Sequence, residues 1–486
     1  EKYVFADRYA SQTLTVDLPT AGSNSCLIIS IVTSTTQIRL ESSVGELSGG
    51  DWAIVSESLD MISNQGVWRP FGDAAQIGVR GKIKDIWPGS GSSSPNHFME
   101  VNGTLFFSAN HETNGTELWK TDGTEAGTSM VKDIISGSGG SSPSNFVEVN
   151  GTLFFSANHG SSGNELWKSD GTAAGTVLVK DIRSGANSSS IAYLTNLKGM
   201  LFFRANDGST GYELWKSDGT EAGTVRVKDI RPGSNSSSPS NFVEVNGTLF
   251  FAANDGSKGT ELWKSDGTEA GTTIVKDIRT GSSSSSLSYL TIMNDHFYFR
   301  AHDGSRGYEL WKSDGTEAGT VLVKDIQTGS GSSSPNYLTE VNGTLYFSAN
   351  DGTLSSELWK SDGTEAGTTM VKDINPGSSS SSLNSLTDVN GTLFFRASDG
   401  STGYELWKSD GTQAGTSLVK DIWPNSSSSS PNNFIAVNGT LFFSANDGLT
   451  GTELWKSDGT QAGTVLAKEI YFGKRADFYF DMSISA

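Results

Sequence analysis

The sequence predicts an all-β protein: an eight-bladed β-propeller of 48-residue, four-stranded blades, plus a small N-terminal β-sandwich. The motif Glu-Leu-Trp-x-x-Asp-Gly-Thr recurs eight times, and neighbouring motif tryptophans are always 48 residues apart. Each repeat holds four short apolar segments bounded by turn residues. No segment shows helical periodicity over three turns. In chain order, the tryptophans that define blades one to eight are Trp119, Trp167, Trp215, Trp263, Trp311, Trp359, Trp407 and Trp455.

The strands of one blade can be read from residues 239–278. The four apolar segments there are NFVEV, TLFFAAN, ELWKSD and TIVKDI. The first two are joined by VNGT, an Asn-Gly hairpin signal, because a type I′ turn needs positive φ at both central residues. Asp-Gly turns follow the second and third segments, and a Ser-rich loop leads to the next repeat. The unit is therefore predicted to be an antiparallel meander.

A single sheet of this kind cannot bury apolar residues on both faces, whereas radially packed blades cover one another. The repeated tryptophans are predicted to be packing anchors between blades, since each aromatic side chain can bury about 150–250 Å². A solenoid is the alternative, but its end repeats usually differ from the others as caps. The end repeats of this chain resemble the middle ones, which favours the propeller.

One element does not fit the count of eight. The Lys-Asp-Ile element occurs nine times, if Lys84–Ile86 and the variant Lys468–Ile470 are both counted. If the termini share a blade, one of these two copies should be the outer strand of the closing blade. The other would be an extra edge strand or a hinge, and the sequence does not choose between the copies.

The flanking segments lack the repeat. Strand-like runs at 13–18, 26–34, 36–43, 51–57 and 74–81 predict that residues 1–81 form a small β-sandwich for attachment or assembly. Residues 82–472 would be the propeller. The tail, 473–486, alternates polar and apolar residues and is predicted to be a strand that could complete the N-terminal module.

The bulk composition excludes several classes of partner. The net charge of −19 argues against nucleic acid and against anionic lipid as partners. Cys26 is the only cysteine, which excludes an intrachain disulfide and a cysteine-based metal site. The longest apolar run, residues 26–32, is too short for membrane insertion.

The repeated Glu-Leu-Trp-x-x-Asp-Gly-Thr-x-x-Gly-Thr pattern resembles the bacterial ELWxxDGT repeat family over roughly residues 82–470. The departures are small: Thr121, Ala173, Gln413 and Gln461. This resemblance implies a cell-surface or secreted setting and no particular chemistry. With a viral origin as the alternative, the predicted localisation is extracellular, the cell surface or the virion surface. Residues 1–80 resemble β-sandwich modules of phage structural proteins and of carbohydrate-associated domains.

The most informative signal is a difference between repeats. Blades three, five and seven carry arginine in the second segment and tyrosine before Glu-Leu-Trp. These candidate ligand-binding residues are Arg204, Tyr212, Arg300, Tyr308, Arg396 and Tyr404. Arginine and tyrosine change together, across one hairpin where cross-strand side chains can touch. Either the arginine packs on the tyrosine and pairs with the adjacent glutamate, such as Glu213, or the pairs are recognition sites for a sugar or a carboxylate.

No catalytic residues and no metal ligands are predicted, because repetition gives rings of like groups rather than the unlike groups of an active site. No cofactor is predicted either. Ca²⁺ is the one possible ion, at the Asp-Gly turns that follow the second segment, such as the turn at Asp207, since hard cations need several oxygens in a loop. The first two repeats lack this aspartate, which favours a structural role for the turns.

The predicted function is a non-enzymatic surface or extracellular structural and binding protein. Its loops would make multivalent contacts with a glycan, with neighbouring proteins of the surface or particle, or with further copies of the chain as a homo-oligomer. The first alternative is a virion component, such as a capsid decoration or tail-fibre protein, attached through residues 1–81. The second is a calcium-dependent scaffold or an enzyme.

Overall fold

The structure is a computed structural model that describes residues 83–88, 91–377 and 379–468, with six strands between residues 2 and 70. The chain divides into two compact units. One comprises residues 1–143 with 171–173, and the other comprises residues 144–170 with 174–486. Blade one lies in the first unit, and blades two to eight lie in the second.

The N-terminal strands form two antiparallel sheets. They are a two-stranded sheet of β1 (Lys2–Ala6) and β2 (Thr13–Asp17), and a four-stranded sheet of β3 (Val32–Ser34), β4 (Gln37–Ser43), β5 (Ser56–Asn64) and β6 (Val67–Pro70). Strands predicted at 13–18 and 36–43 are present, and β3 lies within the predicted run 26–34, whereas β1, β6 and most of β5 were missed. Most of 26–34 and of 51–57, all of 74–81 and the C-terminal tail lie outside the described residues. The sandwich and its completion by the tail therefore stay predictions, as do the domain boundaries.

The propeller prediction is confirmed. Eight four-stranded antiparallel sheets follow the N-terminal strands, and each is built from four consecutive strands bonded in chain order. The first strands of the blades are β7 (Asn96–Val101), β11 (Ser144–Val149), β15 (Ala192–Leu197), β19 (Ser240–Val245), β23 (Ser288–Met293), β27 (Asn336–Val341), β31 (Asn384–Val389) and β35 (Asn432–Val437). The second strands are β8 (Thr104–His111), β12 (Thr152–Asn158), β16 (Met200–Asn206), β20 (Thr248–Asn254), β24 (His296–His302), β28 (Thr344–Asn350), β32 (Thr392–Ser398) and β36 (Thr440–Asn446).

The remaining strands complete the meanders. The third strands carry the motif tryptophans and are β9 (Gly115–Thr121), β13 (Asn164–Ser169), β17 (Tyr212–Ser217), β21 (Thr260–Ser265), β25 (Tyr308–Ser313), β29 (Ser356–Ser361), β33 (Tyr404–Ser409) and β37 (Thr452–Ser457). The fourth strands are β10 (Ser129–Lys132), β14 (Val177–Lys180), β18 (Val225–Lys228), β22 (Thr273–Lys276), β26 (Val321–Lys324), β30 (Thr369–Lys372), β34 (Ser417–Lys420) and β38 (Val465–Lys468).

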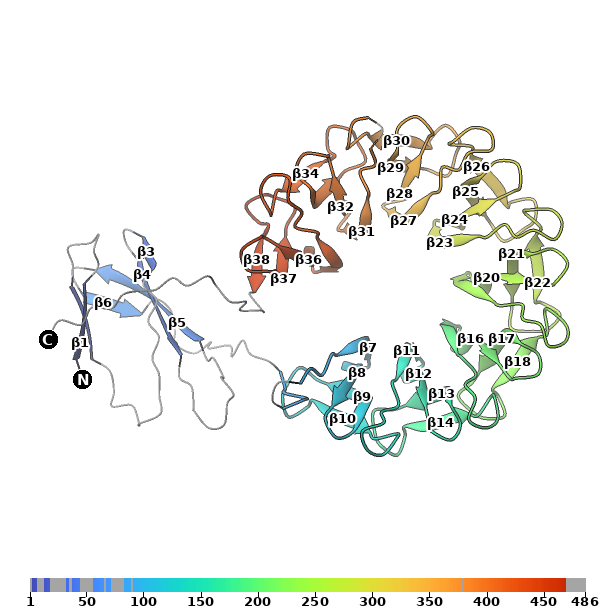
Figure 1. Ribbon diagram of the computed structural model, residues 1–486, viewed down its shortest axis with the longest axis horizontal. Helices are drawn as coiled ribbons and strands as arrows, with labels where there is room; N and C mark the ends of the chain where they lie inside the picture. Colours follow the sequence, from blue (N-terminus) through green and yellow to red (C-terminus); the bar gives the residue numbers. More distant parts are fainter. Residues whose placement is uncertain are drawn as a thin grey trace. The chain divides into compact units, whose positions relative to one another are not determined.

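Within the second unit, blades two to eight follow one another along an arc (Figure 1). Their first strands lie on the concave side, and consecutive first strands contact each other. No helix in the described part of the chain is long and apolar enough to span a membrane.

The fourth strand is shorter than predicted. In blade four, β22 ends at Lys276, although the apolar segment continues to Ile278. The reason is a hydrogen bond outside the sheet: the backbone N–H of Ile278 donates to the Glu261 carboxylate over 2.9 Å. The chain therefore turns away from the ladder after Lys276.

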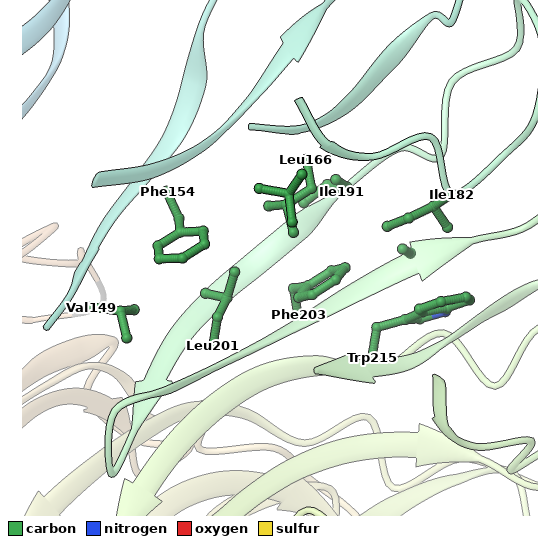
Figure 2. Close-up of a cluster of buried hydrophobic side chains, with 10 residues drawn as sticks. Val149, Phe154, Leu166, Ile182, Ile191, Leu201, Phe203 and Trp215 are labelled. Carbon is green, nitrogen blue, oxygen red and sulfur yellow. The ribbon is translucent and has the colours of Figure 1, made fainter. Parts of the chain in front are cut away.

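The core lies between the blades rather than within them. Figure 2 shows one such cluster, in which Phe154 and Leu166 of blade two pack against Leu201, Phe203 and Trp215 of blade three. Equivalent clusters join each further pair of blades from three to eight. Burial of one such side chain contributes about 1.5–3 kcal/mol, so the interfaces between blades supply most of the hydrophobic stabilisation.

The ninth Lys-Asp-Ile element is explained by this packing. In blade two, Ile182 belongs to the cluster formed with blade three, and Lys180 Nζ donates to the Thr224 carbonyl of blade three over 2.8 Å. Residues 84–86 make the same contacts with blade one without forming a strand. Ile86 packs on Phe107 and Trp119, and Lys84 Nζ donates to the Thr128 carbonyl over 2.7 Å. The strand β38 completes blade eight, so no described blade is shared between the two ends.

Candidate ligand-binding site

The arginine and tyrosine that vary together meet at one edge of their blade, where the second strand ends and the third begins. In blade three, Asn206 at the end of β16 pairs with Tyr212 at the start of β17. The guanidinium carbon of Arg204 lies 5.2 Å from the ring centroid of Tyr212. The equivalent distance is 5.2 Å from Arg300 to Tyr308 and 5.5 Å from Arg396 to Tyr404. All six predicted residues therefore form three arginine–tyrosine clusters.

A second tyrosine, which the sequence analysis missed, joins two of these clusters. The Arg204 guanidinium carbon lies 4.9 Å from the Tyr193 ring, and that of Arg300 lies 4.9 Å from the Tyr289 ring. Tyr193 and Tyr289 stand on the first strands of their blades, so the Arg204 and Arg300 guanidinium groups each lie within cation–π distance of two phenol rings. Cation–π contacts of this kind contribute about 0.5–2 kcal/mol each. In blade seven Ser385 stands at this position, and Arg396 has only the Tyr404 ring.

These extra tyrosines have an unusual backbone conformation. Tyr193 has a φ of 58° and Tyr289 one of 60°, at a register shift between the first and second strands. Asn145 and Asn241 adopt the same conformation in blades two and four. Asparagine tolerates the left-handed region, whereas a bulky residue there costs about 1–3 kcal/mol. The position is left-handed in all eight blades, including Tyr337 of blade six, where Ser348 stands at the arginine position, so this conformation belongs to the repeat and not to the clusters alone.

Each cluster contains a buried donor that has no acceptor. The Nε atoms of Arg204, Arg300 and Arg396 are inaccessible to solvent, and none has a hydrogen-bond partner. One other nitrogen, Nη1 of Arg300, donates to Oδ1 of Asn336 in blade six over 2.6 Å. Buried donors are nearly always paired, and these three arginine Nε–H groups share their open state with buried indole Nε1 atoms such as those of Trp215 and Trp263.

The Ser-rich loop fixes the backbone of the cluster tyrosine. In blade three the N–H of Tyr212 donates to Ser236 Oγ over 2.9 Å. The Tyr212 carbonyl accepts from the N–H of Ser238 over 3.0 Å and from Ser237 Oγ over 3.3 Å. The loop thus has a structural purpose that its low-complexity sequence does not reveal.

The glutamate of the repeated motif holds the same loop. The Glu213 carboxylate is buried and accepts from the N–H of Ile230 over 2.9 Å, and from the N–H and the Oγ of Ser237 over 2.8 and 2.6 Å. This glutamate was expected to pair with Arg204, but its carboxylate accepts hydrogen bonds from Ile230 and Ser237 instead. Glu213 secures the chain after the fourth strand and the Ser-rich loop.

Burial raises the pKa of these glutamates above the ordinary value of 4.5. Desolvation is the main cause, hydrogen bonds from serine and backbone N–H groups partly oppose it, and in blade three the Asp229 carboxylate raises the pKa further. For four of them the pKa is raised to about 7; these are Glu165, Glu213, Glu261 and Glu405.

This shift predicts that the protein is more stable in mild acid than in mild base. Between the ordinary pKa of 4.5 and the folded-state pKa of about 7, the folded chain binds more protons than the unfolded chain. The free energy of unfolding therefore falls as the pH rises through this range, and this contribution is constant above it. We expect the melting temperature to be higher at pH 5.5 than at pH 8 by at least about 2–4 °C, the shift caused by 1 kcal/mol in a large domain.

Thermal unfolding followed by circular dichroism measures this effect. As the control, Glu213→Gln and Glu261→Gln together should reduce the difference between the two pH values, because glutamine cannot ionise. A melting temperature that rises from pH 5.5 to pH 8 would contradict the assignment.

In the blades without arginine, a serine or, in blade four, Ala252 stands at the arginine position. In blade two Ser156 Oγ accepts from Asn145 Nδ2 over 2.9 Å and donates to the Ser144 carbonyl over 3.2 Å. This small polar network leaves the Ser156 hydroxyl paired. Serine therefore satisfies its hydrogen bonds at the position where arginine leaves one donor open.

In the Asp-Gly turns after the second strand, the aspartate carboxylate accepts hydrogen bonds from backbone N–H groups of the same turn. In blade three Asp207 Oδ1 accepts from the N–H groups of Ser209 and Thr210, both over 2.8 Å. Within residues 83–88, 91–377 and 379–468, no group of three or more His, Cys, Asp or Glu side chains is placed to hold a metal ion.

The motif tryptophans are buried, with exposed fractions of 3–7 %. Trp215 and Trp263 each belong to the cluster that joins their blade to the preceding one. Their indole faces are covered by these contacts, and the site for a ligand must be sought elsewhere.

No protein-family model matches the chain. No curated protein matches it either. Solved structures do. A prolyl endopeptidase structure is 13 % identical with a TM-score of 0.42, over 75 % of this chain and 54 % of that one. A puromycin-hydrolysing peptidase of Mycobacterium tuberculosis is 11 % identical with a TM-score of 0.39, over 80 % and 56 %. The β-propeller domain of the Trilobed protease from Pyrococcus furiosus is 12 % identical with a TM-score of 0.34, over 66 % and 96 %.

These findings correct the predicted function. The similar structures are peptidases and a protease propeller domain, so the prediction of a multivalent surface or extracellular structural protein, with a virion component as its alternative, was wrong. The chain spans a little over half the length of the two whole peptidases quoted, and likeness at this identity shows the fold alone. The fold of the chain is a β-propeller.

Proposed function

We propose that this propeller is a non-catalytic recognition module that binds a carboxylate-bearing ligand at the arginine–tyrosine clusters of blades three, five and seven. The observation that carries the proposal is the unpaired, buried Nε–H of Arg204, repeated at Arg300 and Arg396. A guanidinium presents its N–H groups in a planar fork that matches the two oxygens of a carboxylate.

The tyrosine rings support this assignment because they hold the fork in place. Two rings lie within 4.9–5.2 Å of the Arg204 and Arg300 guanidinium carbons and restrict these side chains, so less side-chain entropy is lost when a ligand binds. Tyr193 is 42 % exposed, so its ring is the part of the cluster that a ligand can contact from solvent. An aromatic face beside the fork also favours a ligand with an apolar group next to its carboxylate.

The recognition module is proposed to be non-catalytic because of the groups that each cluster contains. A cluster consists of one guanidinium and one or two phenols. The adjacent acid, Glu213, has its carboxylate occupied by Ile230 and Ser237. A base or a nucleophile paired with an activating group would be needed for hydrolysis.

Benzoate is the probe that tests the proposal, and benzamide is its uncharged counterpart. By isothermal titration calorimetry we expect benzoate to bind and benzamide to bind at least about tenfold more weakly, since a hydrogen bond to a charged group contributes about 1.5–3 kcal/mol. The Arg300 site should be the weakest, because one of its nitrogens already donates to Asn336.

The sister blades provide the matched variants. Arg204→Ser, Arg300→Ser and Arg396→Ser install the residue found at this position in blades one, two, six and eight. The triple variant should fold and lose benzoate binding, whereas Ser156→Ala should bind as the unmodified protein does. Undiminished binding by the triple variant, equal binding of benzamide, or no binding of benzoate would each overturn the proposal.

A further inference from the structure

The turns between the first and second strands differ in one respect that bears on their chemical stability. Six of these turns contain an Asn-Gly pair, at Asn102, Asn150, Asn246, Asn342, Asn390 and Asn438. Each of these asparagines has a φ between 48° and 52°, and the glycine that follows has a positive φ. All six asparagines are exposed. The backbone conformation is therefore nearly the same at each turn, although the Nδ2 of Asn150 also donates to the Gly199 carbonyl of the next blade over 3.1 Å.

The glycine N–H is held by a carboxylate in five of these turns. The N–H of Gly151 donates to Glu148 and that of Gly247 to Glu244, both over 2.5 Å. Gly343 donates to Glu340 over 2.6 Å, Gly391 donates to Asp388 over 2.8 Å, and Gly103 donates to Glu100. The acceptor is always three residues before the glycine.

Blade eight lacks this acceptor. Ala436 stands at the position of the carboxylate, and Gly439 follows the exposed Asn438 in the same left-handed turn, with φ values of 48° for Asn438 and 76° for Gly439. No side-chain acceptor at residue 436 can hold the Gly439 N–H.

We propose that Asn438 is a site of spontaneous deamidation, selected from the six Asn-Gly turns by the missing carboxylate. In the reaction, the backbone nitrogen of Gly439 loses its proton and forms a bond with Cγ of Asn438. The side-chain amide nitrogen takes up the proton and leaves as ammonia, and a succinimide remains. Water then opens this ring to aspartate or isoaspartate.

The carboxylate opposes this reaction in the other five turns for two reasons. It accepts the N–H whose proton must leave, and its negative charge repels the charge that develops on the nitrogen and on the attacked amide. At Asn438 neither effect operates. Conversion adds one negative charge, and the isoaspartate form lengthens the backbone within the turn that pairs Val437 with Thr440.

The test follows all six sites in one molecule. The folded protein is incubated at mildly alkaline pH, and peptide mapping by mass spectrometry measures aspartate and isoaspartate at each asparagine over time. We expect Asn438 to convert at least about tenfold faster than Asn246, a ratio that corresponds to about 1.4 kcal/mol.

Two reciprocal substitutions test whether fast conversion at Asn438 is caused by the missing carboxylate or by its location in the last blade. Ala436→Glu should slow conversion at Asn438 by about tenfold, and Glu244→Ala should accelerate conversion at Asn246 by a similar factor. An Asn438 that converts no faster than Asn246 overturns the proposal. Rates that do not respond to either substitution overturn it as well, because they would assign the difference to blade eight as a whole.

Discussion

Replacing Phe251 with alanine is expected to lower the free energy of unfolding by about 3–5 kcal/mol. The Phe251 side chain is 0 % exposed and lies in the cluster between blades three and four. Its neighbours there include Leu197, Phe202 and Trp263. Because these residues stand on hydrogen-bonded strands of two different blades, the backbone cannot close around the vacated space, and the cavity term adds to the lost burial.

Denaturant unfolding measures the loss, and hydrogen exchange locates it. In a repeat architecture each unit is stabilised mainly by its neighbours, so protection should fall most in blades three and four. Val225→Ala is the matched control, since Val225 is 38 % exposed and should change the free energy of unfolding by less than about 0.5 kcal/mol. A loss below about 1 kcal/mol for Phe251→Ala would show that this interface repacks freely, contrary to the expectation.

Removing the buried glutamate of blade three should have an effect of similar size. At pH 6, Glu213→Ala is expected to lower the free energy of unfolding by about 3–5 kcal/mol, because unsatisfied buried polar groups cost about 1–3 kcal/mol each. The substitution leaves the N–H of Ile230 and the N–H and hydroxyl of Ser237 without their acceptor. Water cannot easily replace it, because Glu213 and Ser237 are both 0 % exposed.

The consequences should reach the candidate site. Ser236, Ser237 and Ser238 all bond the backbone of Tyr212, so a released loop should also weaken benzoate binding in blade three. Glu213→Gln should lose less stability than Glu213→Ala, since one oxygen acceptor remains. Glu221→Ala, at an exposed position of the same blade, is the control. A stability loss no larger for Glu213→Ala than for Glu221→Ala would contradict this account.

The sequence was sufficient to predict the blade because its signals are local. The 48-residue interval, the alternation of strand segments such as TLFFAAN and the Asn-Gly turns all lie within one repeat. The predicted ends of the fourth strands were wrong because a residue distant in the sequence forms a hydrogen bond with the chain there. Ile278 leaves the sheet because of Glu261, which lies 17 residues before it in the chain, and no periodicity encodes this contact.

The candidate site was predicted in part for the same reason. Arg204 and Tyr212 vary together within one hairpin, and their contact followed from that. Tyr193 was missed because its contribution depends on a left-handed backbone at a strand bulge, which only the folded strand pairing reveals. Its sequence signal was also masked, since Tyr337 stands at the same position in blade six, where Ser348 replaces the arginine.

The segment 84–86 shows where one packing unit ends and the next begins. The contacts that secure a blade include the Lys-Asp-Ile segment contributed from before it, so the unit that is physically complete starts one element earlier than the sheet. Duplication or loss of any 48-residue stretch within the array reproduces the same kinds of contact at the new junction. Gene recombination can therefore change the number of blades in such a chain without requiring compensating substitutions between the copies.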